Sequence, residues 1–168
     1  MMTESLPARS KEYVSQSIEE IYKKYASMVY RVGFSYLKNT ADAEDIAADV
    51  FVKLLKSGVK FQSEEHEKAW LLRAAINLCK NNLKSRKRKA LDICEYENLQ
   101  AEDQIQKNEI LQSVMELPER YKSVIYLYYY EGYTTAEIAR ILKKPNSSVR
   151  VYLHEARKIL KGVLENEE

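Results

Sequence analysis

The stretch TTAEIARILKKPNSSVRVYLHEARKILK, residues 134–161, contains two amphipathic segments separated by a short polar break. Thr134 is followed three residues later by Glu137, which forms a capping box that satisfies free backbone N–H groups and starts a helix. Pro145 cannot continue that helix, and residues 146–148 are good types to begin a second one. The stretch therefore predicts a helix, a tight turn and a second helix.

The second predicted helix has an apolar side and a polar side. We expect its core side to comprise Val149, Leu153, Ala156 and Leu160. In a DNA-binding helix-turn-helix the second helix enters the major groove by its N-terminal end. The alternative is an antiparallel helical hairpin that only packs, and the motif alone does not decide between the two. On the DNA-binding interpretation the groove-facing residues are Ser148, Arg150, Val151, His154 and Glu155.

The segment before this stretch, LPERYKSVIYLYYYEG, has Pro118 where a helix can start and Gly132 where one should end. Its apolar residues recur at helical spacing, although YLYYY resembles a strand in composition. With a further helix over Ile105–Met115, we expect a C-terminal domain of four helices. The residues at this spacing are Tyr121, Val124, Ile125, Tyr128 and Tyr129, and we expect most of these tyrosines to be core residues.

Composition favours helices throughout the chain. Of 168 residues only four are Gly and three are Pro, and 45% are hydrophobic, so we expect an all-α fold. The apolar run at residues 124–130 is far too short to span a bilayer, and residues 1–13 have no apolar segment of the signal-peptide type. These features predict a cytoplasmic protein without membrane insertion.

The net charge of +2 conceals a segregation of charge along the chain. Residues 1–91 contain 17 basic against 11 acidic side chains, residues 92–109 one against six, and residues 110–168 nine against eight. A short acidic block with few large apolar residues is typical of a linker. We therefore expect two small helical domains joined by an acidic linker, with the helix-turn-helix in the C-terminal domain.

The cysteines and histidines give no sign of a metal site. Cys79 and Cys94 lack CxxC spacing, and only His66 and His154 accompany them, so we expect reduced thiols and no structural zinc. The chain has no Walker loop, no metal-ligand cluster and no nucleophile with an identifiable base. It is therefore predicted to have no catalytic residues, no metal and no cofactor.

A second helix is predicted after the polar break at Asn39–Thr40. The residues Asp42, Asp45 and Asp49 recur at i, i+3 and i+7, and this acidic stripe suits a basic protein surface. Alternatively, the first carboxylates favour the positive helix N-terminus and the rest form a solvated face. The predicted buried face of this helix is Ala43, Ile46, Ala47, Val50, Phe51, Leu54 and Leu55.

A third predicted helix, AWLLRAAINLCKNNLKSRKRK, carries two faces of different chemistry. We expect its core face to be Leu71, Ala74, Ala75, Leu78 and Cys79. Cations, amides and an aromatic side chain on the other face suit a nucleic-acid strand, because cations contact phosphates and aromatics stack on unpaired bases. Trp70 can equally be a core residue. The second face comprises Trp70, Arg73, Asn77, Lys80, Asn81 and Lys84.

The order of these motifs resembles the extracytoplasmic-function (ECF) sigma factors, a compact group of the bacterial sigma-70 family. The resemblance covers residues 18–164. It implies an N-terminal extension at 1–17, a region 2 at 18–91 that binds core RNA polymerase and reads and melts the minus-10 element, a linker at 92–109, and a region 4 at 110–168 that reads the minus-35 element. The implied partners are core RNA polymerase, through its β′ clamp helices and β flap, promoter DNA and an anti-sigma factor.

The resemblance also implies residue roles. Phe51 would support the core-polymerase-binding segment from inside, the loop at 60–68 together with Asn77, Lys80 and Asn81 would handle the opened minus-10 strand, and the residues already expected to face the groove would read the minus-35 element. The polymerase-contacting residues would be Asp42, Glu44, Asp45, Asp49 and Lys53.

Several positions depart from the family pattern. Ser147 and Ser148 replace a common Gly-Thr, and Val151, Tyr152 and Glu155 replace residues that are often small and polar or arginine. Base preference depends on such side chains, so the promoter sequence is not predicted. The competing hypothesis is a homodimeric helix-turn-helix regulator that binds operator duplex without polymerase. It would leave the acidic stripe and the polar face of the third helix without a role.

Overall fold

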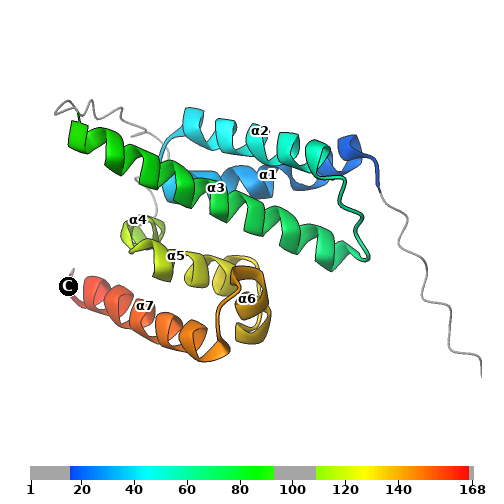
Figure 1. Cartoon of the computed structure of the whole chain (residues 1–168). Coiled ribbons are helices and arrows are strands. Elements are labelled where there is room, and N and C mark those ends of the chain that lie inside the picture. The colour runs from blue at the N-terminus through cyan, green and yellow to red at the C-terminus, as the bar shows by residue number, and fades with distance from the viewer. Residues whose placement is uncertain (1–15, 93–108, 167–168) are drawn as a thin grey trace, which may run out of the picture.

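The computed structural model describes residues 16–92 and 109–166, and these form two stacked layers of helices (Figure 1). The secondary structure of this part is entirely helical, which confirms the all-α prediction. The upper layer contains α1 (Ile18–Leu37), α2 (Thr40–Ser57) and α3 (Glu64–Asp92). The lower layer contains α4 (Glu109–Glu116), α5 (Glu119–Ile125), the π-helix η1 (Tyr126–Tyr130), α6 (Thr135–Leu142) and α7 (Asn146–Asn166). Most of the predicted linker lies outside the described residues.

Local signals in the sequence set the ends of α1 and α2. Ser17 and Glu20 form a reciprocal capping box at the start of α1. Lys38, with φ of 55°, ends α1 in the left-handed conformation, and the Asn39 side chain then accepts a hydrogen bond from the Asp42 N–H at 3.0 Å. Gly58, with φ of 63°, ends α2, because glycine adopts this conformation at no steric cost.

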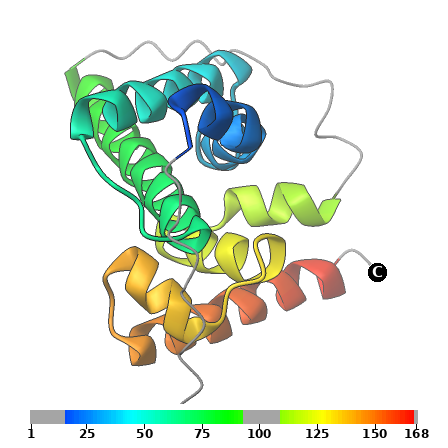
Figure 2. The same ribbon diagram turned by 90° about the vertical axis from the view of Figure 1, so that its right-hand side faces the viewer.

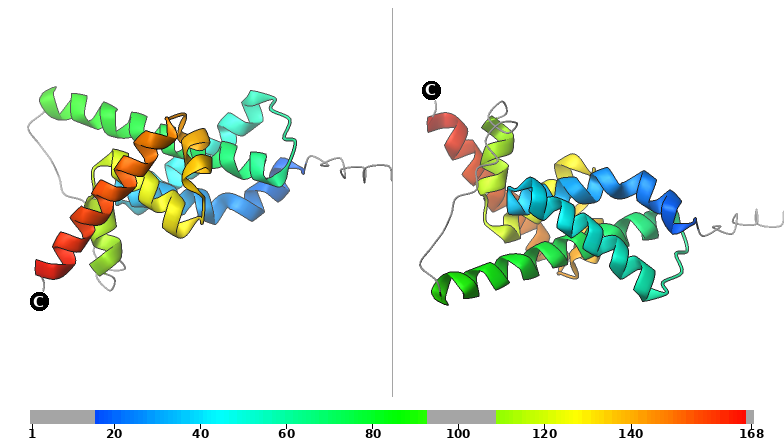
Figure 3. Two further views of the ribbon diagram at one scale, coloured as in Figure 1. Left: turned by 90° about the horizontal axis from the view of Figure 1, so that it is seen from below. Right: turned by 90° about the horizontal axis from the view of Figure 1, so that it is seen from above.

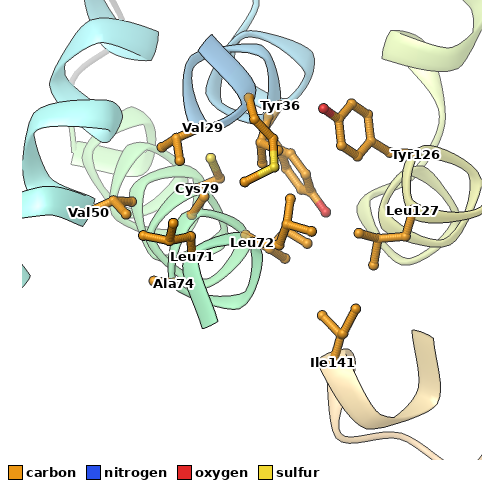
Figure 4. Packing of buried hydrophobic residues seen from close by; sticks show 14 of the residues in the cluster. Val29, Tyr36, Val50, Leu71, Leu72, Ala74, Cys79, Tyr126, Leu127 and Ile141 are labelled. Carbon is orange, nitrogen blue, oxygen red and sulfur yellow. The ribbon is translucent and has the colours of Figure 1, made fainter. Parts of the chain in front are cut away.

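The upper layer packs around the apolar faces of its three helices. Val29 of α1, Val50 of α2 and Leu71 of α3 are all fully buried (Figure 4). Gly33 lets α1 approach α2 closely, because a Cβ atom there would lie 3.2 Å from the Ala43 Cα. The predicted buried faces of α2 and α3 are therefore largely confirmed.

One residue of the predicted α2 stripe is not buried. Leu55 is 61% exposed, whereas its neighbour Leu54 is 5% exposed. Successive residues on a helix are separated by about 100°, and the centre of the buried face runs through Ala43, Ile46 and Val50. Leu55 lies to one side of that line and points toward solvent, so its assignment to the core was wrong.

The third helix buries a second face that the sequence analysis did not assign. Leu72 and Ile76 are as completely buried as Leu71, with exposures of 0% and 1%. Leu72 lies on the side of α3 that faces Leu127 and Ile141 of the lower layer (Figure 4). The buried side chains of both layers therefore form one continuous hydrophobic cluster, and Figure 2 shows the lower layer packed beneath α1 and α3.

The segment α5–η1 is central to the lower layer. All six residues from Lys122 to Leu127 are buried, because this segment lies between α7 and the upper layer. The last five residues of the segment form a π-helix, whose wider turns change the helical register. As a result Tyr126 is buried while Tyr129 is 56% exposed, and the prediction that Tyr129 is a core residue was wrong.

The helix, turn and helix of residues 134–161 are confirmed. The Thr134 side chain accepts a hydrogen bond from the Glu137 N–H at 3.3 Å, and the Glu137 carboxylate accepts one from the Thr134 N–H at 2.8 Å. Lys143 adopts the left-handed conformation at the end of α6. Residues 146–148 are already helical, so α7 begins directly after Pro145 rather than after a polar cap. The core-facing residues Val149, Leu153 and Ala156 are buried, and Leu160 is partly buried.

Candidate protein and nucleic-acid binding surfaces

The acidic stripe on α2 is accessible. Glu44, Asp45 and Asp49 are exposed, and among the described residues none of the three forms an ion pair. Asp42 differs, because it is half-buried and pairs with Arg86 of α3. Asp45 and Asp49 are therefore the carboxylates most available to a basic partner.

Apolar side chains accompany the stripe. Val52 and Leu55 are 44% and 61% exposed on the same helix, and Lys53 lies exposed between them. Phe51 is buried and contacts the ring of Tyr22 edge-on, with ring centroids 4.9 Å apart. The predicted supporting position of Phe51 thus agrees with its burial, and the exposed apolar surface beside the carboxylates is typical of a protein interface.

A groove of about 480 Å³ lies beside the acidic stripe, between α1 and α2. The sequence analysis did not find it, because its wall on α1 carries no charge pattern that marks it. Tyr22 is 52% exposed at this site, and small side chains on α2 leave the space open. The lining residues are Tyr22, Ala26, Ser27, Tyr30, Arg31, Glu44, Ala47 and Ala48.

The residues of the predicted nucleic-acid face of α3 lie in different environments. Asn77, Asn81 and Lys84 are exposed, and the C-terminal ends of α3 and α7 diverge (Figure 3). Trp70 is half-buried and contacts Phe61 edge-on at 6.0 Å between ring centroids. Its packing supports the structural interpretation of the indole.

Arg73 contacts the helix-turn-helix. Its Nε donates a hydrogen bond to the carbonyl of Ile141 at 2.7 Å, and its Nη2 donates one to the carbonyl of Arg140 at 3.2 Å. These carbonyls belong to the last turn of α6, where the negative end of the helix dipole favours a cation. Arg73, which was predicted to lie on the nucleic-acid face of α3, therefore joins the two layers in this structure.

Two further cations of α3 lie at the same boundary. Burial, followed by repulsion from Lys144, lowers the pKa of Lys80. Lys68 forms an ion pair with Glu131 at 2.9 Å and lies 5.4 Å from the centroid of the Tyr133 ring. Lys68 and Lys80 of α3 therefore interact with the lower layer in this structure.

Lys122 is a buried cation at the boundary between the layers. Burial and the nearby Lys38 lower its pKa from 10.5 to about 8. The unfolded chain binds this proton more tightly, so the free energy of unfolding should rise by about 1 kcal/mol between pH 8 and pH 9. The thiol of Cys79 opposes part of this rise over the same interval, because burial raises its pKa from 9.0 to about 12 and the unfolded chain therefore loses this proton first.

Urea unfolding followed by circular dichroism at pH 8 and pH 9 tests this dependence. In Lys122→Met the rise should disappear, whereas the exposed-lysine control Lys23→Met should retain it. An equal rise in Lys122→Met would assign the pH dependence to another group.

The predicted DNA-reading residues lie along one side of α7. Arg150, Val151 and His154 are exposed, and Ser148 and Glu155 are half-buried. The Oε1 atom of Glu155 lies 3.9 Å from the Nζ atom of Lys158, which is one helical turn further along α7. Helix rotation separates these residues from the side of α7 on which Val149 and Leu153 are buried, so Arg150, Val151 and His154 are accessible.

One of the two cysteines, Cys79, lies in the described part of the chain. Cys79 is buried with a free thiol whose pKa is raised, as expected of an unreactive cysteine, and Cys94 lies outside the described residues. Within residues 16–92 and 109–166, no three His, Cys, Asp or Glu side chains are grouped to hold a metal ion. No helix in these same ranges is both long and apolar enough to cross a membrane.

Comparison with known proteins identifies the family. The model of sigma-70 region 2 matches residues 21–89, and that of sigma-70 region 4 matches residues 107–160. The RNA polymerase sigma factor SigV of Bacillus subtilis is 32% identical over 144 residues, which cover 83% of this chain and 86% of that protein. The chain belongs to the ECF group of the sigma-70 family. It is an RNA polymerase sigma factor, and the operator-binding homodimer is not favoured.

Another relative agrees with this assignment, and two solved structures share the fold. The ECF RNA polymerase sigma factor SigW of Bacillus subtilis is 25% identical over an alignment of 182 residues, covering 98% of this sigma factor and 97% of the relative. The fold matches that of the sigma factor RpoE of Bartonella quintana, solved with the anti-sigma factor NepR, at a TM-score of 0.73 and 17% identity, covering 89% of this chain and 98% of that one. CnrH, solved with the cytosolic domain of CnrY, matches at a TM-score of 0.64 and 18% identity, covering 90% and 89% of the two chains.

Proposed function

We propose that the two layers divide the work of this sigma factor. Residues 18–91 bind core RNA polymerase and handle the minus-10 element, and residues 110–168 read the minus-35 element and pack on the β flap. The observation that carries the proposal is a pair of exposed carboxylates, Asp45 and Asp49, which form no ion pair with any described residue and lie beside the groove between α1 and α2. The region 2 and region 4 matches, which fall on separate layers, support the same division.

The polymerase-binding surface combines charge with exposed apolar area. Asp45 and Asp49 attract a basic surface, while Val52 and Leu55 lose contact with water when they are covered. Glu44 lies at the rim of the groove, and Lys53 extends the exposed surface along the helix. In this scheme Asp42 acts through its ion pair with Arg86, which holds the start of α2 against α3.

Promoter contacts are divided between α3 and α7. Asn77, Asn81 and Lys84 are accessible to an opened minus-10 strand, whereas Trp70 supports the loop through Phe61. Arg73 and Lys80 join that surface only when the lower layer moves away from α3. On α7 the exposed residues Arg150, Val151 and His154 enter the minus-35 groove, flanked by Ser148 and Glu155.

The sigma factor itself catalyses no bond formation in this scheme and acts in the cytoplasm, where the polymerase is. Opening duplex costs about 1.4 kcal/mol of stacking per base-pair step, so a few captured bases do not sustain a bubble without the polymerase. RpoE was solved in complex with the anti-sigma factor NepR, and CnrH in complex with the cytosolic domain of CnrY. Because this chain shares their fold, we propose that an anti-sigma protein regulates it as well.

Gel filtration of the purified protein with bacterial core RNA polymerase, without DNA, tests the proposal. Comigration is expected, followed by initiation on a subset of fragments of the host genome. Separate elution of the two proteins would contradict the assignment of the acidic stripe to polymerase binding.

The closed packing of the layers predicts an effect of Arg73. Replacing it with methionine removes two charge-assisted hydrogen bonds to α6, each worth roughly 1.5–3 kcal/mol. The Arg73→Met protein should populate an open arrangement, seen by small-angle X-ray scattering as a larger radius of gyration at unchanged helix content. Arg88→Met, an exposed change on the same helix, should leave the radius unchanged. Equal radii for both variants would show that Arg73 does not hold the layers together.

A further inference from the structure

A cavity of about 280 Å³ lies between the two layers, and it shares Tyr30 and Arg31 of its α1 wall with the groove between α1 and α2. One wall comes from α1, and the other comes from α4, α5 and η1. Aromatic residues and one methionine make up half of the lining residues. The lining residues on which the argument rests are Arg31, Phe34, Met115, Lys122, Tyr126 and Tyr130.

Lys122 brings a buried charge to this cavity. It is 4% exposed, and among the described residues no carboxylate forms an ion pair with it. Its Nζ lies 5.4 Å from the centroid of the Tyr36 ring. Burying an ammonium without a counter-ion costs free energy, so an anion that reaches this group would recover part of the cost.

The remaining charges in the cavity leave it positive. Arg31 contributes a second cation to the wall. Glu131 is already satisfied, because its Oε1 accepts a hydrogen bond from the Tyr126 hydroxyl at 3.0 Å and its Oε2 pairs with Lys68 at 2.9 Å. Two cations therefore face the cavity with no carboxylate left over for them in its described wall.

We propose that this cavity binds a small aromatic carboxylate. Lys122 and Arg31 hold the carboxylate, since charge-assisted hydrogen bonds from cations are the strong ones. Phe34, Tyr126 and Met115 contact the ring. The volume is just below the range of about 300–1,000 Å³ common for ligand sites, which selects a molecule with one ring and one acidic group and excludes a nucleotide.

Ligand binding is coupled to the arrangement of the layers. Both layers contribute walls, so the ligand binds the closed arrangement and stabilises it by mass action. A bound carboxylate would therefore keep Arg73 and Lys80 engaged with the lower layer and reduce promoter binding. This consequence rests on the proposed function, whereas the binding site itself does not.

Isothermal titration of the full-length protein with phenylacetate tests the site, with neutral phenylacetamide as the matched ligand. Saturable one-to-one binding of phenylacetate is expected, with at least tenfold weaker binding of the amide. Lys122→Met and Arg31→Gln should each weaken phenylacetate binding at least tenfold, and the control Lys23→Met should leave it unchanged. Failure of phenylacetate to bind, equal binding of acid and amide, or unchanged affinity in both cavity variants would overturn the proposal.

Two controls keep these results interpretable. Circular dichroism melting checks that Lys122→Met is folded, and because Arg31 is exposed, Arg31→Gln decides the matter if the buried substitution fails to fold. Small-angle scattering with saturating phenylacetate should show a smaller or equal radius of gyration for Arg73→Met, never a larger one. Comigration with core RNA polymerase is measured without phenylacetate, so a failure of the cavity proposal is distinct from a failure of the sigma-factor surfaces.

Discussion

Changing both Asp45 and Asp49 to lysine is expected to weaken binding to core RNA polymerase about a hundredfold while leaving the fold intact. Both carboxylates are exposed and unpaired within the described part of the chain, so the reversal breaks no internal contact. Like charges placed opposite each other at an interface cost several kcal/mol, and about 2.7 kcal/mol corresponds to a hundredfold change in affinity. Fluorescence-detected titration of labelled protein with core polymerase measures the effect.

A matched control separates this local effect from net charge. Glu65→Lys combined with Glu116→Lys changes the net charge by the same amount at exposed positions outside α2 and should bind polymerase normally. Circular dichroism should give the same helix content for both doubly substituted proteins. Unchanged affinity of the Asp45 and Asp49 variant for core polymerase would mean that the acidic stripe is a solvated face of α2. Polymerase binding would then not depend on these two carboxylates.

Leu72→Ala is expected to lower the free energy of unfolding by about 2–5 kcal/mol, the range for large-to-small changes in a core. Leu72 is completely buried where α3 meets Leu127 and Ile141 of the lower layer (Figure 4), so its loss leaves a cavity between the layers. Urea unfolding followed by circular dichroism measures the change.

Leu55→Ala is the control for that experiment, because it removes the same atoms from a side chain that is 61% exposed. It should change the free energy of unfolding by no more than about 0.5 kcal/mol. Similar losses for the two variants would contradict the burial pattern of α2 and α3. The comparison also tests the exposure of Leu55, which helical periodicity predicted to be buried.

Sequence patterns predicted the helix-turn-helix because its signals are local. The capping box at Thr134 and Glu137, the break at Pro145 and the buried Val149 and Leu153 all depend on residues a few positions apart. The acidic stripe was found for the same reason. Tyr129 was misassigned because a π-helix changes the register within one turn, and no spacing rule for an α-helix anticipates that change.

Most of the helices, their main apolar faces and the charge of the surfaces of this sigma factor follow from local patterns, because caps and helical periodicity act within a few residues. Three features could be known only from the packing of the two layers: the second buried face of α3, the hydrogen bonds from Arg73 to carbonyl groups 67 and 68 residues away, and the burial of Lys122 beside a cavity. Those features arise where the two layers meet. They depend on contacts between side chains distant in the chain, and hydrophobic burial, which drives such contacts, is non-directional.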